Sequence, residues 1–296
     1  MPVSDNQSKV DEIKKGLREI ARQNEESRQS EHDDRIQSWL FPADPYINLK
    51  RALNTRHPGS GAWFLQDEQY LQWKSSLKSS LWLHGLAGCG KTVLVSSIVE
   101  NLQQAIGANR LASSSPILLY FFFDFRDKRK QSLEDMARTL AHQLYYQDIS
   151  IRQPLDKLLH ACGDGYRKPS TELLLRVILD FLLITGRRVY LVFDALDECP
   201  VPRYDLLDWI RMIARLTDQR IHLLVTSRKE PDIDSVLGRD NVIDQVIAAQ
   251  SDIIDADIRA YITDTLRTNV AFKRWDGHEN VQQMIRDSLF EKSDGM

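Results

Sequence analysis

One short motif restricts the folds open to this chain more than any other feature. Residues 85–92 read GLAGCGKT and match the phosphate-binding pattern G-x-x-x-x-G-K-[ST] at every fixed position. The backbone of such a loop curls around a phosphate chain, and a Cβ at Gly85 or Gly90 would oppose the required dihedrals. Lys91 would supply charge to the phosphate oxygens, and the Thr92 hydroxyl would complete the shell of a Mg²⁺ ion. The motif therefore predicts a protein that binds a nucleoside triphosphate.

The residues on either side of the loop support this interpretation. Residues 81–84 form a short apolar stretch typical of a buried strand, and apolar side chains recur at helical spacing from Val93 to Ile106. Strand, glycine loop and helix is the order that the motif requires. That order disfavours the alternative, a glycine-rich turn with an incidental lysine.

Composition argues against several classes of protein. The chain has 296 residues, of which 42% are hydrophobic, enough for one large α/β domain or a core with a smaller companion. A net charge of −3 gives no basic field, so we do not expect nucleic acid as a partner. No apolar run approaches the ~18 residues of a membrane helix, and the N-terminus lacks the features of a signal peptide. The spacing of Cys89, Cys162 and Cys199 suits neither disulfides nor a metal, which favours a reducing, cytoplasmic location.

The N-terminal residues predict an amphipathic helix over 8–30. Val10, Ile13, Leu17 and Ile20 form a narrow apolar seam in an otherwise polar stretch. The helix either packs on its own domain or binds a partner or a second copy, and periodicity alone leaves both open. Proline and glycine then predict two breaks, at 41–45 and at 57–61.

Beyond the loop, strand and helix patterns alternate along the chain. Strands are expected at 117–123, 188–193 and 221–226, with a further edge strand at 242–247, and helices at 132–146, 149–161, 170–185 and 204–216. Two more helices follow residue 253. This order predicts an α/β P-loop NTPase three-layer sandwich with a mainly parallel sheet, preceded by an N-terminal helix and followed by a partial helical domain. The expected divisions are an N-terminal helical segment, a pre-loop segment, the NTPase core and the start of a helical domain, at 1–35, 36–75, 76–250 and 251–296.

A second group of chemical residues follows the strand at 188–193. Asp194 stands at the carboxyl end of that strand, where parallel-sheet nucleotide folds place a metal-positioning carboxylate. We expect Asp194 to hold Mg²⁺, and Asp197 or Glu198 to orient or deprotonate the attacking water. The alternatives are a helix N-cap for Asp194 and solvated first-turn carboxylates for the other two.

Basic residues follow two other strands. Arg228 comes directly after the strand at 221–226, where it could sense the γ-phosphate or, alternatively, pair with a neighbouring carboxylate. Arg126 and Lys128 are weaker candidates for phosphate contact, since solvated surface charge explains them equally well. Cys89 is interpreted as a small filler in the loop and not as a nucleophile.

Together, the motifs at 85–92 and 194–198 closely resemble those of NACHT-domain STAND NTPases, which are related to the nucleotide-binding modules of NOD-like receptors. The segments 56–65, 120–125 and 226–228 further resemble the fungal branch of these proteins, also called nephrocystin-3-like in its N-terminal part. The resemblance extends from about residue 36 to the end of the chain.

The resemblance implies a signalling switch that binds ATP/ADP, or GTP/GDP, with Mg²⁺ and hydrolyses the triphosphate slowly. Its nucleotide state would control homo-oligomerisation and effector output, in innate-immunity or incompatibility-type responses. The resemblance also implies further domains beyond Met296, so we expect the chain to be truncated. By the same resemblance the segment from about His57 to Trp63, with His57, Pro58 and Gly59, would lie against the base and ribose. The nucleotide-binding residues expected of the loop are Gly85, Leu86, Ala87, Gly88, Cys89, Gly90, Lys91, Thr92 and Val93. The alternatives are a nucleotide-binding scaffold without significant hydrolysis and a fast-turnover P-loop ATPase.

Overall fold

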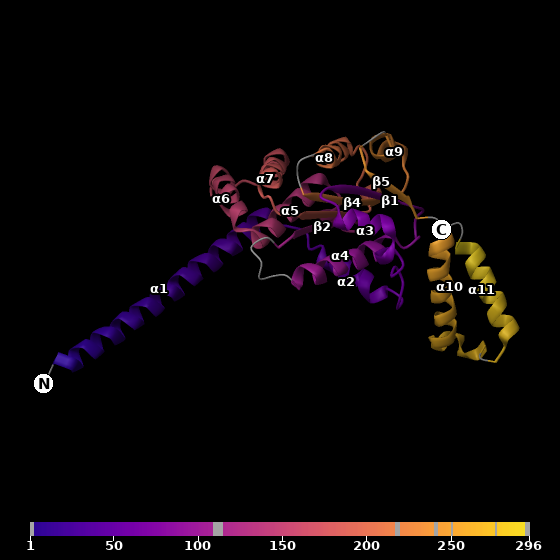
Figure 1. The fold of residues 1–296 in the computed structure, drawn as a ribbon, viewed down its shortest axis with the longest axis horizontal. Helices are drawn as coiled ribbons and strands as arrows, with labels where there is room; N and C mark the ends of the chain where they lie inside the picture. Colours follow the sequence, from indigo (N-terminus) through magenta and orange to yellow (C-terminus); the bar gives the residue numbers. More distant parts are fainter. Residues whose placement is uncertain are drawn as a thin grey trace.

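The fold is seen in a computed structural model, which describes residues 3–108, 115–216, 220–239, 242–249, 251–275 and 277–293. Side chains are described from residue 14 onward, except at 251–258, 260, 270 and 290–293. Figure 1 shows a layered body formed around one sheet, a long helix that projects from one end, and a helical pair at the other.

A five-stranded sheet forms the centre of the body. It consists of β1 (Ser79–His84), β2 (Ile117–Phe122), β3 (Val189–Asp194), β4 (Ile221–Ser227) and β5 (Gln245–Ala248), in the order β2-β3-β4-β1-β5. All neighbouring strands are parallel. Nearly all residues of the first four strands are buried, because both faces of the sheet are covered, and each of these strands contains an apolar run. The predicted strands, including the edge strand, are confirmed.

Two apolar cores lie on opposite faces of the sheet. On one face, Leu81 and Leu83 pack with Val95 and Ile98 of α4 (Lys91–Gly107) and with Trp73 of α3 (Glu68–Ser75). The opposite face is covered by α5 (Leu133–Gln147), α6 (Arg152–Ala161), α7 (Thr171–Ile184), α8 (Tyr204–Ala214) and α9 (Pro231–Leu237). This arrangement confirms the predicted three-layer α/β sandwich. The remaining helices are α2 (Tyr46–Thr55), α10 (Ser251–Thr268) and α11 (Glu279–Ser293).

Three short helices were not predicted. The sequence places two breaks before the loop, and both are present, but α2 lies between them and α3 follows the second. Helix α9 is the next element after β4 and begins at Pro231, with Glu230 as its N-cap residue. These helices have 10, 8 and 7 residues, which is shorter than the window over which helical periodicity is distinguishable from chance.

The N-terminal helix α1 (Val3–Leu40) is longer than predicted and ends only at the first break. Leu17 and Ile20 are 61% and 56% exposed, so this part of the seam does not pack on the protein's own core. The side chains of Val10 and Ile13 lie outside the described set. The last turns of α1 are anchored to the body, through buried side chains and a hydrogen bond from Trp39 Nε1 to the Arg167 carbonyl at 2.9 Å.

Within the described ranges, none of the helices combines the length and apolar content that crossing a bilayer requires.

Candidate functional site

The glycine loop connects β1 to α4, and it requires glycine at different positions for two different reasons, backbone conformation and close packing. Gly88 and Gly90 have φ of 79° and 85°, in the left-handed region that other residues rarely adopt. Gly85 is not in that region. Its constraint is packing instead, since a Cβ there would lie 2.8 Å from the Ala249 Cβ and 2.9 Å from the Cys89 Sγ. The dihedral explanation is therefore confirmed for Gly90 and wrong for Gly85.

The side chain of Lys91 is folded back onto the loop. Its Nζ donates to the carbonyl oxygens of Gly85 and Leu86 at 2.8 and 2.6 Å, and lies 3.6 Å from the Cys89 Sγ. The ammonium group is thus held at the mouth of the loop by neutral acceptors. A phosphate oxygen that entered the loop would replace neutral acceptors with a charged one, which makes a stronger hydrogen bond.

Thr92 and Asp194 meet at the carboxyl ends of the central strands. The Thr92 hydroxyl donates to Oδ2 of Asp194 at 2.7 Å, and the Thr226 hydroxyl donates to Oδ1 at 2.6 Å. The carboxyl group is 1% exposed, and burial raises its pKa while the two hydroxyl hydrogen bonds oppose that shift. Asp194 caps no helix, because the short helix that follows begins after Ala195, whose φ is 58°. The N-cap alternative for Asp194 is therefore wrong.

These donors suit Mg²⁺ but do not form a complete metal site. A hydroxyl and a carboxylate are the hard oxygen ligands that this ion prefers. Among the described residues no cluster of three or more His, Cys, Asp or Glu side chains could hold a metal ion. A Mg²⁺ ion here would therefore need phosphate oxygens and water for the rest of its shell, which is how this ion is usually held beside nucleotides.

The two acids after Asp194 have different surroundings. Asp197 accepts from Arg228 through both oxygens, from the backbone N–H at 2.9 Å and from Nε at 2.6 Å. Asp197 also raises the pKa of the Arg228 guanidinium. Glu198 accepts only a backbone bond in the described set, from Phe125 N at 3.0 Å, and burial raises its pKa. Arg228 thus pairs with a neighbouring carboxylate, Asp197, as the alternative to a phosphate sensor predicted. Its contact with phosphate stays a prediction.

Buried Arg203 holds the segment that carries these acids. Its guanidinium donates to the Leu196 carbonyl at 3.0 Å and pairs with Glu230 and Asp232 at 2.5 and 2.9 Å. Glu230 in turn pairs with Arg228 at 3.1 Å. The acids at 197–198 and the start of α9 are therefore linked through arginine. The sequence offered no signal for Arg203, because its partners come from distant positions.

Three cavities surround the loop, each named here after one residue that lines it. The Arg228 cavity, of about 400 Å³, is lined by Ala87, Gly88, Gly90, Lys91, Thr92, Val93, Phe125, Ala195, Asp197, Glu198 and Arg228. The Asn48 cavity, of about 270 Å³, is lined by Asn48, Arg51, Ala52, Thr55, Thr92, Val93, Phe123, Asp124, Phe125, Arg126, Asp194 and Glu198. The predicted lysine, threonine, acids and arginine are thus gathered in one region, from three separate parts of the chain.

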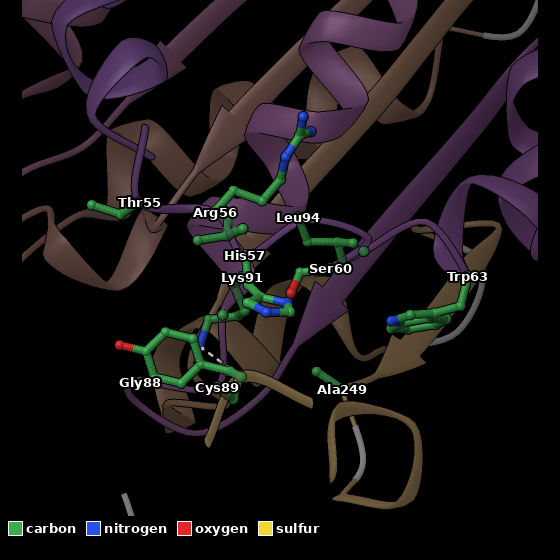
Figure 2. Close-up of a pocket in the computed structure, with 14 residues that line it drawn as sticks. Thr55, Arg56, His57, Ser60, Trp63, Gly88, Cys89, Lys91, Leu94 and Ala249 are labelled. Carbon is green, nitrogen blue, oxygen red and sulfur yellow. Dashed lines mark hydrogen bonds between the residues drawn. The ribbon is translucent and has the colours of Figure 1, made fainter. Parts of the chain in front are cut away.

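The third cavity borders the same loop and shares Gly88, Gly90, Lys91 and Val93 with the Arg228 cavity. This His57 cavity, of about 330 Å³, is lined by Thr55, Arg56, His57, Ser60, Gly61, Trp63, Gly88, Cys89, Gly90, Lys91, Val93, Leu94, Ala249 and Tyr261. Figure 2 shows His57 and Ser60 beside Lys91, with Arg56 pointing away, where it pairs with Glu100 at 3.0 Å. Pro58 and Gly59 are not among its lining residues, and Leu86 is 64% exposed.

Some residues at the site had little or no sequence signal. Asn48 and Arg51 belong to the unpredicted helix α2, and Tyr261 belongs to a helix that was predicted without any role. Arg126, a weaker candidate, lines the Asn48 cavity, with its guanidinium 5.1 Å from the centre of the Phe125 ring. Lys128 lies exposed in a short helical turn.

Comparison with known proteins adds a family and a set of structures. Residues 59–228, more than half of the chain, match the family described as Nephrocystin 3, N-terminal. The chain is similar to the crystal structure of Cdc6p from Pyrobaculum aerophilum, with 15% identity and a TM-score of 0.43, covering 78% of this chain and 53% of that one. It is also similar to the Aeropyrum pernix ORC2 protein, with 15% identity and a TM-score of 0.41, covering 71% of this chain and 51% of that one. The chain spans about half the length of both structures. A search of curated proteins gives no match.

Proposed function

The chain belongs to the nephrocystin 3 N-terminal family, and from the geometry of its loop and acids we propose that it is a nucleotide-dependent switch. It binds ATP or GTP with Mg²⁺, hydrolyses the triphosphate slowly, and couples nucleotide state to self-association and effector signalling in the cytoplasm. The responses it serves are of the innate-immunity or incompatibility type. Family and loop together support the nucleotide-binding part of this proposal.

The contact between Thr92 and Asp194 carries the proposal. Their oxygens lie 2.7 Å apart, so both can face one Mg²⁺ ion, directly or through water. The glycine loop leads directly into α4, whose first two residues are Lys91 and Thr92, and backbone N–H groups at such a helix start can donate to phosphate oxygens. A bound Mg²⁺ would supply charge neutralisation for the β- and γ-phosphates. The protein's own residues would position and orient them.

Glu198 is the better candidate for the residue that activates water. The carboxylate of Asp197 is engaged at both oxygens by Arg228, whereas Glu198 keeps a free oxygen beside the Arg228 cavity among its described contacts. A carboxylate with a raised pKa is also the stronger base. Arg228 lines the same cavity as Lys91 and Thr92, and it is the candidate for contact with the γ-phosphate.

Calorimetry on the whole chain tests nucleotide binding. Lys91→Ala should weaken the affinity for MgATP or MgGTP by at least about tenfold, because a charge-assisted contact to phosphate is lost. Lys157→Ala, an exposed lysine on α6, is the matched control and should bind like wild type. Chromatography of the nucleotide released on denaturation would identify the base. Equal affinity in the Lys91 variant and wild type would contradict the assignment of the loop.

Two alternative functions, a fast-turnover ATPase and a binding-only scaffold, would use the same site. Single-turnover hydrolysis tests the first, and assembly of a Glu198 variant tests the second. A fast-turnover ATPase would show single-turnover hydrolysis much faster than a switch requires. In a binding-only scaffold, Glu198→Gln should leave assembly unchanged. The switch predicts that this variant accumulates the triphosphate-bound, assembly-prone state, visible as increased light scattering with ATP.

A further inference from the structure

The two outer strands of the sheet differ in length and composition. In the order β2-β3-β4-β1-β5, these outer strands are β2 and β5. Strand β5 has four residues, whereas β2 has six, which read ILLYFF and continue into Phe123. An apolar, aromatic run of this kind, without charge or proline, pairs readily with other strands when its edge is open. The β2 edge is therefore the one at which this sheet would most easily acquire a further strand.

Successive residues of β2 point their backbone groups to opposite sides. The N–H of Ile117 donates to the carbonyl of Arg188, directly before β3, at 2.8 Å, so the odd-numbered residues bond toward β3. The even-numbered residues, Leu118 and Tyr120 among them, therefore point their N–H and C=O groups away from the sheet. In an edge strand these outward groups are the ones that an added strand would bind.

Two glutamine side chains of α5 bind these outward groups instead. The carboxamide of Gln147 accepts from the N–H of Leu118 at 3.1 Å and donates to the carbonyl of the same residue at 2.8 Å. Gln143 makes the same two bonds with Tyr120, at 3.0 and 2.8 Å. A carboxamide has one carbonyl acceptor and an N–H donor, like a peptide group. Each glutamine therefore satisfies one residue of β2 in the way that a neighbouring strand would.

The arrangement rests on two matching spacings. Gln143 and Gln147 are four residues apart on a helix, which corresponds to about 6 Å along its axis. Leu118 and Tyr120 are alternate residues of a strand, which lie about 6.6 Å apart. Helix and strand thus present their hydrogen-bonding groups at nearly the same interval. Leu144, between the two glutamines, is fully buried, so α5 is anchored beside the strand.

We propose that Gln143 and Gln147 act as a substitute strand, which closes the β2 edge against pairing with the β2 of a second copy of this chain. A second copy fits this edge because a strand can pair antiparallel with itself about a two-fold axis, and both partners then offer the same apolar run. Gln147 is exposed, so the edge lies at the protein surface, within reach of another molecule. The inference is independent of the proposed nucleotide site.

Sedimentation velocity of nucleotide-free double variants tests this inference. Gln143→Leu with Gln147→Leu removes all four bonds and adds no charge, so the fraction of dimer or larger species should rise with protein concentration. Gln143→Lys with Gln147→Lys also leaves the N–H groups of β2 without acceptors, but like charges at the edges of two copies repel, so this variant should stay monomeric. Gln104→Leu, at an exposed position of α4, is the control. Association of both double variants, or of neither, would overturn the inference.

Amide exchange of the wild type, followed by NMR, does not depend on how the double variants fold. The amides of Leu118 and Tyr120 should exchange about as slowly as that of Leu119, which faces β3. Gln143→Leu alone should speed exchange about tenfold at Tyr120, and Gln147→Leu alone at Leu118, because each removes one local bond. Rapid exchange of both amides in the wild type would show an open edge and overturn the inference. Nucleotide affinity should be unchanged in all these variants, so failure of the proposed function would leave this test intact.

Discussion

The hydroxyl of Thr92 lies 2.7 Å from Oδ2 of Asp194, although 102 residues separate the two in the chain. Thr92 lies in the first turn of α4, the helix after β1, and Asp194 ends β3. In the sheet, β4 lies between these strands, and its Thr226 donates to the other oxygen of the same carboxylate. Three strand ends thus converge on one buried acid.

The first prediction concerns that acid and its hydroxyl partner. Asp194→Asn and Thr92→Ala should each weaken nucleotide affinity about tenfold when Mg²⁺ is present, because an oxygen ligand or its positioning bond is lost. With EDTA present, both variants should bind like wild type. Thr92→Ser keeps the hydroxyl and is the control. Calorimetry with and without Mg²⁺ decides, and an equal loss under both conditions would argue against a metal role.

The second prediction separates the two neighbouring carboxylates. Glu198→Gln should slow single-turnover hydrolysis by about 10²–10⁴-fold with little change in affinity, as expected when a general base is removed. Asp197→Asn should act differently, because it releases Arg228 from its bonded partner. We expect a smaller loss of rate for Asp197→Asn. Rapid-quench measurements check both, and a larger loss in the Asp197 variant would reverse the assignment.

The third prediction concerns the packing of the first loop glycine. Gly85→Ala should lower the free energy of unfolding by about 1–3 kcal/mol, because its methyl group would overlap Ala249 and Cys89. Gly107→Ala is the matched control. It has open space around its Cβ position, so its effect should be neutral or stabilising by up to about 1 kcal/mol. Urea unfolding compares the two, and equal stabilities would contradict the packing argument.

The fourth prediction is a pH dependence from His222. This side chain is fully buried, and burial lowers its pKa from 6.5 to about 4. Its Nδ1 lies 2.6 Å from the Trp73 carbonyl oxygen, which requires the Nδ1–H tautomer of the neutral ring. In the unfolded chain the ring takes up a proton below about pH 6.5, whereas the folded protein does so only near pH 4. Stability should therefore fall as the pH drops through this window, by at most about 3 kcal/mol.

A variant isolates this contribution from the acids that titrate in the same range. His222→Gln keeps a hydrogen-bond donor but has no titrating ring. The difference in unfolding free energy between wild type and this variant should change between pH 7 and pH 4, as measured by urea unfolding. A constant difference would show that His222 does not titrate as predicted.

Local sequence was enough to predict the central architecture. Each of the first four strands contains a short apolar run, and the loop motif carries its own strand–loop–helix order, so the parallel sheet could be predicted from short windows. The loop lysine and Asp194 were identifiable for the same reason. Both residues act near the carboxyl end of a strand, and a strand end can be recognised from the neighbouring residues in the sequence.

Contacts between distant segments had to come from the folded molecule. No local pattern relates Tyr261 to His57 or Arg203 to Glu230, because such pairs are chosen by how whole elements pack. The reason why position 85 is glycine also changed, since its constraint comes from Ala249 and Cys89 and not from its own dihedrals. Periodicity reports which face of a segment is buried, whereas the partner that buries it is set by strand order and loop path, which depend on the entire chain.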